Sequence, residues 1–128
     1  MTGLIHLDTS FLIRALVGGS PEGARLRAWV RQQTPLGISA ICWTEFLCGP
    51  LSEEQVGLAR LLVSELVAYT DAHARTAALL FNAGGRRRGS VVDCMVAATA
   101  IGAGATLATS NPKDFRRFES AGLQIAGP

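Results

Sequence analysis

Short apolar runs alternate with segments of helical periodicity, and this alternation constrains the fold more than any other feature of the sequence. Apolar runs of strand length lie at 3–7, 36–40, 67–70, 105–109 and 123–127. The segments between them repeat apolar residues at the spacing of an amphipathic helix. Strands that alternate with helices form an open, mainly parallel sheet with helices on both faces. We therefore predict an α/β fold with four to five strands.

Capping patterns mark where several of the predicted helices begin. Ser52 and Gln55 form a capping box, in which the side chains and backbone N–H groups of the first turn bond reciprocally. Ser90 and Asp93 have the same form, so Ser90 is expected to cap the helix that carries Asp93. These patterns also offer a purely structural explanation for some acidic residues.

Composition favours one soluble domain over residues 1–128. The chain is 48% hydrophobic and 17% charged, which is enough to build one core and too apolar for intrinsic disorder. Three cysteines without a CxxC pair indicate reduced core residues rather than disulfides or a zinc site. No apolar stretch reaches the about 18 residues of a membrane span, and no export signal is visible, so we expect a cytoplasmic protein.

Four acidic residues occupy the transitions between predicted strands and helices. Asp8 directly follows the first strand, and Glu45 lies one turn into the helix after the second. Asp93 lies in the first turn of the helix before the fourth strand, and Asp114 follows that strand. Ligands of open α/β sheets bind beyond the carboxyl ends of the strands. We expect the four carboxylates to meet at that edge.

Such a cluster predicts a metal site. Carboxylates that lie close together repel one another, so they either hold a proton or bind a hard cation. Oxygen ligands without neighbouring Cys or His favour Mg²⁺, with Mn²⁺ as a substitute, over zinc. A divalent ion of this kind polarises a phosphodiester and lowers the pKa of a bound water. Asp8, Glu45, Asp93 and Asp114 are thus candidate metal ligands and catalytic residues for phosphodiester hydrolysis.

Each acid also has a structural explanation. Asp8 is well placed to cap the first helix, Glu45 to lie on a solvated helix face, and Asp114 to belong to a helix start. Asp93 is the hardest to explain in this way, because its helix is apolar nearly all round and is expected to be buried. A buried carboxylate costs free energy unless it is paired or bound to metal.

Four segments resemble the PIN-domain nucleases, and within them the VapC-type toxins of toxin–antitoxin pairs. They read LIHLDTSFLI, SAICWTEFL, VVDCMVAATAIGAGATLATSNPKDF and FRRFESAGLQI, and together they span nearly the whole chain. The resemblance implies a Rossmann-like three-layer α/β/α sandwich. It also implies a Mg²⁺-dependent endoribonuclease that cleaves RNA.

The resemblance assigns roles to individual residues. Asp8, Glu45 and Asp93 stand at the three principal acidic positions of the family. The fourth position departs from the pattern, because many relatives carry an acid where this chain has Asn111; either Asn111 or Asp114 fills it.

Two hydroxyl residues and two partners complete the implied picture. Ser10 and Thr109 match positions that support the site by hydrogen bonds. Relatives commonly form homodimers and are held inactive by a cognate antitoxin protein that covers the active groove. The resemblance therefore implies an antitoxin and a second copy of the chain as partners.

Arginine supplies eleven of the twelve cationic residues, and its planar guanidinium suits phosphate recognition. Arg86, Arg87 and Arg88 lie in a glycine-flanked loop before the helix of Asp93, where they are expected to contact RNA phosphates. Arg116 and Arg117 are a second candidate pair. A solvated loop without a role explains the run equally well.

Other functions fit the sequence less well. A phosphotransfer receiver needs an acidic pair after the first strand, and a haloacid-dehalogenase-type phosphatase needs DxD, whereas this chain has Asp8-Thr9-Ser10. His6 is expected to be a hydrogen-bonded core residue, and His73 lies in a first helical turn, so neither predicts a nucleophilic triad. A non-catalytic PIN-like RNA- or protein-binding module remains the main alternative.

Overall fold

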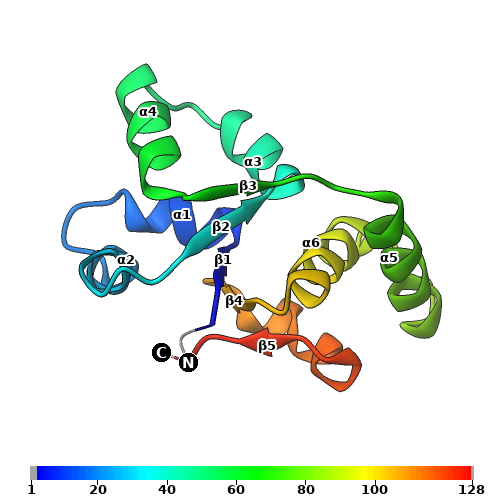
Figure 1. Cartoon of the computed structure of the whole chain (residues 1–128). Helices are drawn as coiled ribbons and strands as arrows, with labels where there is room; N and C mark the ends of the chain where they lie inside the picture. The colour runs from blue at the N-terminus through cyan, green and yellow to red at the C-terminus, as the bar shows by residue number, and fades with distance from the viewer. Residues whose placement is uncertain (1–2, 128) are drawn as a thin grey trace.

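The computed structural model describes residues 3–127 and confirms the α/β fold. All strand pairs are parallel, and the sheet has the order β3-β2-β1-β4-β5 (Figure 1). The strands are β1 (Ile5–Leu7), β2 (Leu36–Ser39), β3 (Glu65–Val67), β4 (Thr106–Ala108) and β5 (Gln124–Ile125).

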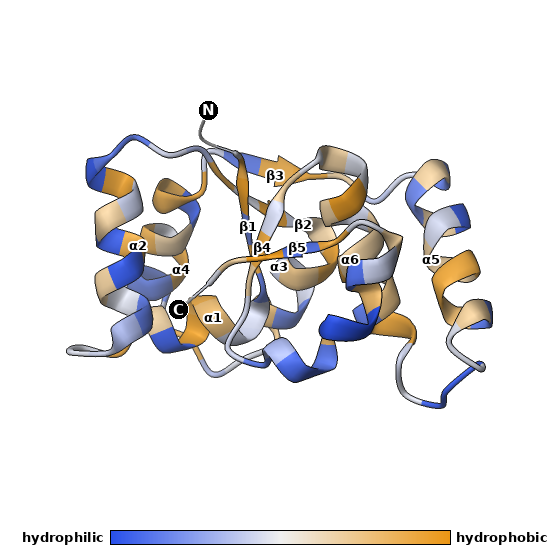
Figure 2. Ribbon diagram, turned by 90° about the horizontal axis from the view of Figure 1, so that it is seen from below, coloured by the Kyte–Doolittle hydropathy of each residue, from blue (hydrophilic) through white to orange (hydrophobic). Residues whose placement is uncertain are grey.

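Helices cover both faces of the sheet. They are α1 (Thr9–Ala15), α2 (Pro21–Arg31), α3 (Ala40–Leu47), α4 (Glu53–Leu62), α5 (Asp71–Ala83) and α6 (Val91–Ala103), followed by the 3-10 helices η1 (Pro112–Asp114) and η2 (Arg116–Ala121). Helices α1, α2 and α4 lie on one side, and α5 and α6 on the other (Figures 1 and 2). The layers match the predicted α/β/α sandwich. Within residues 3–127, every helix is too short or too polar to span a bilayer.

The strand order reverses at the centre of the sheet, between β1 and β4. From β1 the chain builds outward through β2 to β3, and then returns to place β4 on the other side of β1. His6 is therefore in register with Gly37 on one side and with Leu107 on the other. In open parallel sheets, ligands bind where the strand order reverses in this way. The carboxyl ends of β1 and β4 are the expected location of a site.

The core packs between the sheet and the helices. Phe11, Ile38, Phe46 and Leu107 are at most 1% exposed, and Figure 2 shows hydrophobic residues concentrated on the strands and on the inner helix faces. Helix α6 is buried along most of its length, from Cys94 through Ala100 apart from Met95, as its all-round apolar sequence predicts. All three cysteines are free thiols; Cys42 and Cys94 are buried, as predicted for core residues, whereas Cys48 is exposed.

Two local predictions are wrong. The third strand is Glu65–Val67 rather than 67–70, because Ser64 bonds to Leu36 and starts the pairing earlier, while Thr70 caps α5. Ser90 does not cap α6 through its side chain. Its hydroxyl donates instead to the carbonyl of Arg87 at 2.7 Å. Asp93 therefore does not belong to a capping box.

His6 is a core residue, as predicted, but without the predicted hydrogen bond at Nε2. The residue is 2% exposed, and its Nε2 atom has no hydrogen-bond partner within residues 3–127. Burial, with a smaller contribution from the charge of His73, lowers the pKa of His6 to about 4. Its ring lies against Gly37, where an added Cβ would come within 2.9 Å of Cδ2. His6 is thus a neutral residue of the sheet layer.

Candidate acidic active site

Asp8 follows β1 directly and is 7% exposed. Its backbone N–H donates to the carbonyl of Ala108 on β4 at 2.9 Å, which fixes the residue at the carboxyl ends of β1 and β4. One carboxylate oxygen, Oδ1, accepts from the N–H of Thr9 at 2.9 Å, so Asp8 does cap α1. The structural explanation of Asp8 is correct, but it accounts for only one of the two carboxylate oxygens.

Hydroxyl groups hold the other oxygen of Asp8. Oδ2 accepts from Thr109 Oγ1 at 2.7 Å and from Ser10 Oγ at 2.9 Å. The Cys42 thiol lies 3.6 Å from Oδ1. Burial, and secondly the charge of Asp8, raise the pKa of Cys42 to about 12, so the thiol keeps its proton as a donor. The predicted supporting roles of Ser10 and Thr109 match these contacts.

Glu45 lies on the exposed face of α3 and is linked to the turn of Asp8 by Thr9. The Thr9 hydroxyl lies 3.2 Å from Glu45 Oε1 and 3.1 Å from the carbonyl oxygen of Cys42. Sequence reasoning missed Thr9. The available signal was its place between two residues already assigned to the site.

Asp93 lies in the first turn of α6 with its side chain 34% exposed. Within the described chain its carboxylate makes no hydrogen bond, and its nearest cation is Arg117, whose Nη2 lies 3.8 Å from Oδ2. Burial raises the pKa of Asp93 above its ordinary value, and Asp114 raises it further, while Arg117 opposes the shift. Smaller effects come from Asp8 and Glu45.

The charges of Asp114, Asp8 and Glu45 all act on Asp93, so the three other predicted acids lie within electrostatic range of it, although the four do not form a close cluster within residues 3–127. Asp114, at the end of η1, exerts the largest effect of a neighbouring charge. Asn111 is exposed, and its backbone N–H donates to Thr109 Oγ1 at 3.0 Å. Asn111 thus supports the loop through its backbone, and Asp114 is the carboxylate near Asp93. We call Asp8, Glu45, Asp93 and Asp114 the acidic edge.

The acidic edge fits a hard divalent cation by its residue types. Over residues 3–127, no three His, Cys, Asp or Glu side chains lie close enough to form a ready-made metal cluster. Mg²⁺ does not require one, since it usually keeps several waters and binds directly through one or two carboxylates together with substrate phosphates. Oxygen donors with mutually repelling charges suit such an ion better than zinc.

The predicted arginine loop adjoins α6. Arg86 has a positive φ of 56° between Gly85 and the rest of the run, and its N–H donates to the carbonyl of Phe81. Ser90 holds the carbonyl of Arg87 at 2.7 Å, so the loop is fixed directly at the start of the helix that carries Asp93. The side chains of Arg86, Arg87 and Arg88 are exposed, as is Arg116.

Comparisons with known proteins agree with the fold. A model of the PIN domain matches residues 5–120. VapBC2 of Rickettsia felis, solved with a promoter DNA fragment, is similar at 20% identity and TM-score 0.73, covering 96% of this chain and 97% of that one. A toxin–antitoxin complex of Klebsiella pneumoniae is 26% identical with TM-score 0.69, covering 88% and 90%.

A third solved structure, VapC20 of Mycobacterium tuberculosis, is described as a toxin that cleaves the sarcin–ricin loop. It is 18% identical with TM-score 0.65, covering 97% of this chain and 99% of that one. No curated protein matches the chain.

Proposed function

This chain belongs to the PIN-domain family, and on that premise we propose that it is a metal-dependent endoribonuclease acting as the toxin of a toxin–antitoxin pair. One observation carries the proposal: Asp8 lies where the strand order reverses, and Asp93 of α6 lies within electrostatic range of Asp8 and of two further acids from α3 and η1. A sheet gains nothing in stability from mutually repelling acids, so their retention indicates a function.

Of Asp8, Glu45, Asp93 and Asp114, one or two would bind Mg²⁺ or Mn²⁺ directly, and the others would bind it through water. The bound ion would polarise the scissile phosphodiester and lower the pKa of an attacking water. Ser10 and Thr109 keep the carboxylate of Asp8 oriented, and Thr9 aligns Glu45 with it. Hydrogen bonds from neighbouring groups of this kind typically tune the ligands of a metal site.

Arg86, Arg87, Arg88 and Arg116 would bind the RNA strand. All are exposed, and the loop of Arg86–Arg88 adjoins the helix of Asp93. Contacts to phosphate position a strand without reading its sequence, and they make affinity depend on salt. They also offset the repulsion between an anionic strand and the acidic edge.

Cleavage of total RNA in Mg²⁺, Mn²⁺ and EDTA tests the activity. We expect cleavage with either ion, none in EDTA, and none by Asp93→Asn purified in parallel, which excludes a contaminating nuclease. Arg75→Gln, an exposed residue on α5 paired with Asp71, is the control for surface substitution. Binding of RNA without cleavage, unchanged by EDTA, would instead establish the non-catalytic module.

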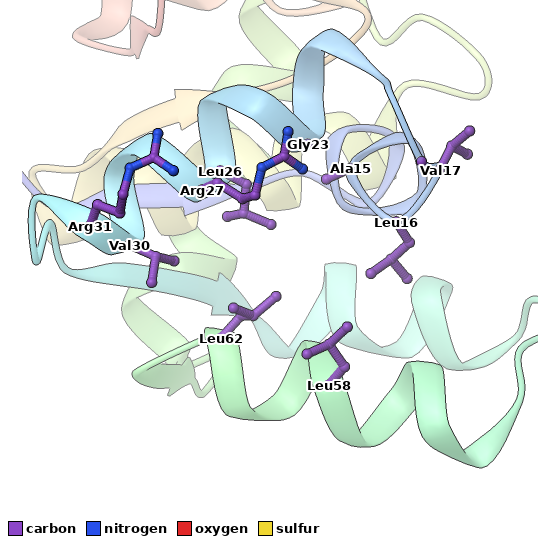
Figure 3. A pocket seen from close by; sticks show the side chains of 11 residues that line it. Ala15, Leu16, Val17, Gly23, Leu26, Arg27, Val30, Arg31, Leu58 and Leu62 are labelled. Carbon is purple, nitrogen blue, oxygen red and sulfur yellow. The ribbon is translucent and has the colours of Figure 1, made fainter.

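An antitoxin would require a surface to bind, and a groove between α1–α2 and α4 offers one. The groove has a volume of about 440 Å³ and is lined mainly by apolar residues. Figure 3 shows Leu58 and Leu62 of α4 pointing across it toward Leu16 and Val30. Leu58 is 51% exposed and Val30 is 43% exposed. Exposed apolar residues that line one groove are typical of a surface that a partner covers.

Charge specifies the segment that would fill this groove. Arg27 and Arg31 line it on the side of α2 (Figure 3), and no acid is among its lining residues. The solved complexes of similar proteins contain antitoxins. We propose that the antitoxin inserts a helix or extended segment with apolar residues inward and acidic residues toward the two arginines.

Co-expression with the proposed antitoxin tests that placement. Leu58→Asp is expected to abolish co-purification, because it buries a charge in the contact. Leu61→Asp on the same helix is the matched control, since Leu61 is 85% exposed and outside the groove. Equal binding by both variants would rule out the groove as the contact.

We also propose that the chain forms a homodimer. Leu79 on α5 and Val91 and Val92 at the start of α6 are 70%, 47% and 39% exposed and supply apolar surface for a second copy. Light scattering is expected to give twice the monomer mass of 13.5 kDa. The Leu79→Asp variant is expected to give the monomer mass. A monomer at micromolar concentration would contradict this.

A further inference from the structure

A small hollow lies between the end of α5 and η2, beside the acidic edge. Leu80 and Ala83 of α5 and Ser120 and Ala121 of η2 line it, together with Arg117. Its volume is about 160 Å³, below the about 300 Å³ at which sites for drug-sized ligands begin. The hollow therefore has room for one small group, and its mainly apolar lining favours a group with an apolar face.

Arg117 connects the hollow to the acidic edge. Its guanidinium lies 4.5 Å from the ring centroid of Phe118, and Phe118 is buried at 3% exposure, so the cation is held over a fixed surface. The same guanidinium lies 3.8 Å from Asp93 Oδ2. Arg117 is thus a positioned cation with the proposed reaction centre on one side and the hollow on the other.

The hollow reaches the end of α5, two residues before the basic loop. Gly84, which follows α5, is among its lining residues, and the chain proceeds directly to Arg86–Arg88. A cation at one end and a basic loop at the other select an anionic chain. The apolar walls between them select a group that is itself uncharged and flat.

We propose that the hollow binds the base of the nucleotide next to the scissile bond, with Arg117 contacting that nucleotide's phosphate. A nucleobase has the required size and apolar faces, and in single-stranded RNA it is free to turn out of a stack. This inference rests on the proposed ribonuclease function and names the subsite that would position its substrate.

Two kinds of variant test the base and the phosphate contact separately. Ala83→Leu and Ala121→Leu fill the hollow at exposed positions that tolerate a larger side chain. Arg117→Gln removes the cation. Matched controls are Ala103→Leu at the exposed far end of α6 and Arg75→Gln on the outside of α5.

Binding of a fluorescent 12-nucleotide RNA is measured by anisotropy at several salt concentrations, with Ca²⁺ replacing Mg²⁺ and the RNA checked for integrity. Filling the hollow is expected to weaken binding about 5-fold or more without changing the salt slope, since stacking is uncharged. Arg117→Gln is expected to reduce the slope of log K against log salt by about 1. Controls stay within about 2-fold of wild type.

An abasic RNA of the same length gives the decisive comparison. Its affinity is expected to be insensitive to the filled hollow but still sensitive to Arg117→Gln. Filled variants that bind and cleave normal RNA as wild type does would overturn the base subsite while leaving the nuclease intact. Wild-type protein that neither binds nor cleaves RNA would overturn the proposed function itself, and the subsite with it.

Discussion

Asp8 and Asp93 lie at the same edge of the sheet, but their charges are compensated in different ways. Asp8 is 7% exposed and accepts hydrogen bonds from a backbone N–H and two hydroxyls. Asp93 has no hydrogen bond within residues 3–127 and faces Arg117 at 3.8 Å, with its pKa raised by burial and by Asp114. One acid is part of the local structure, and the other is left electrostatically unsatisfied.

Because of this difference, the two acids are expected to contribute differently to the stability of the protein and to its activity. A carboxylate with full hydrogen bonding contributes to folding, since its removal leaves donors without partners. A carboxylate that is raised in pKa by like charges opposes folding at neutral pH and is relieved by a cation. Asp8 is thus expected to serve both structure and function, and Asp93 function alone.

Amide substitutions of the two acids give the largest expected effect. Asp8→Asn and Asp93→Asn should each reduce RNA cleavage about 100-fold or more, because each removes a proposed metal ligand. Only Asp8→Asn should lower the free energy of unfolding, by about 1–3 kcal/mol. The NH₂ group of the new amide would face groups that already donate to the Asp8 carboxylate, so both would lack an acceptor. Urea unfolding at pH 7 measures this. Equal destabilisation by both substitutions would contradict the comparison.

Removal of one donor to Asp8 should have a smaller effect. Thr109→Val deletes the 2.7 Å hydrogen bond and is expected to cost about 1 kcal/mol of stability and about 10-fold in cleavage. Thr106→Val is the matched control, since the Thr106 hydroxyl only meets the exposed Gln124 side chain, at 3.3 Å. Cleavage by Thr109→Val at the wild-type rate would show that Asp8 needs no such support.

The pH dependence of stability should identify Asp93 as the unsatisfied acid. Its pKa is raised above the ordinary 3.8, so the folded state holds the proton more tightly than the unfolded chain does. The stabilising contribution of that proton is present at low pH and lost as pH rises through the raised pKa. The free energy of unfolding of Asp93→Asn should therefore exceed that of the wild type at pH 7, by at most about 1 kcal/mol because solvent screens the charges.

That advantage should shrink when unfolding is measured near pH 4, where wild-type Asp93 is increasingly protonated. A constant difference between the two proteins across this range would show that the amide acts through packing rather than charge.

Cysteine labelling should give the smallest but most direct readout of the environment of Asp8. Cys48 is exposed and is expected to react with iodoacetamide in the folded protein, while Cys42 and Cys94 are buried and should be protected. Burial and the charge of Asp8 raise the pKa of Cys42 to about 12, which also suppresses its thiolate. Asp8→Asn should accelerate labelling of Cys42 more than labelling of Cys94, as followed by mass spectrometry.

Local chemistry in the sequence determined much of this protein. The alternation of strand and helix periods predicted the parallel sheet, because each period follows from backbone geometry within a few residues. The same patterns placed Asp8 after the first strand, Asp93 in a first helical turn and Asp114 after the fourth strand, with Glu45 one turn into its helix. The third strand was misplaced because it is an edge strand whose Glu65 and Leu66 are exposed, which weakens its apolar pattern.

Tertiary structure alone decided which of these residues meet. The contact of Thr109 with Asp8 joins positions 101 residues apart and depends on β4 pairing beside β1. The pairing of Arg117 with Asp93, the hollow between α5 and η2, and the close fit of His6 against Gly37 depend equally on long-range packing. Periodicity shows which face of an element is buried, but strand order and helix docking are set by cooperative burial across the whole core.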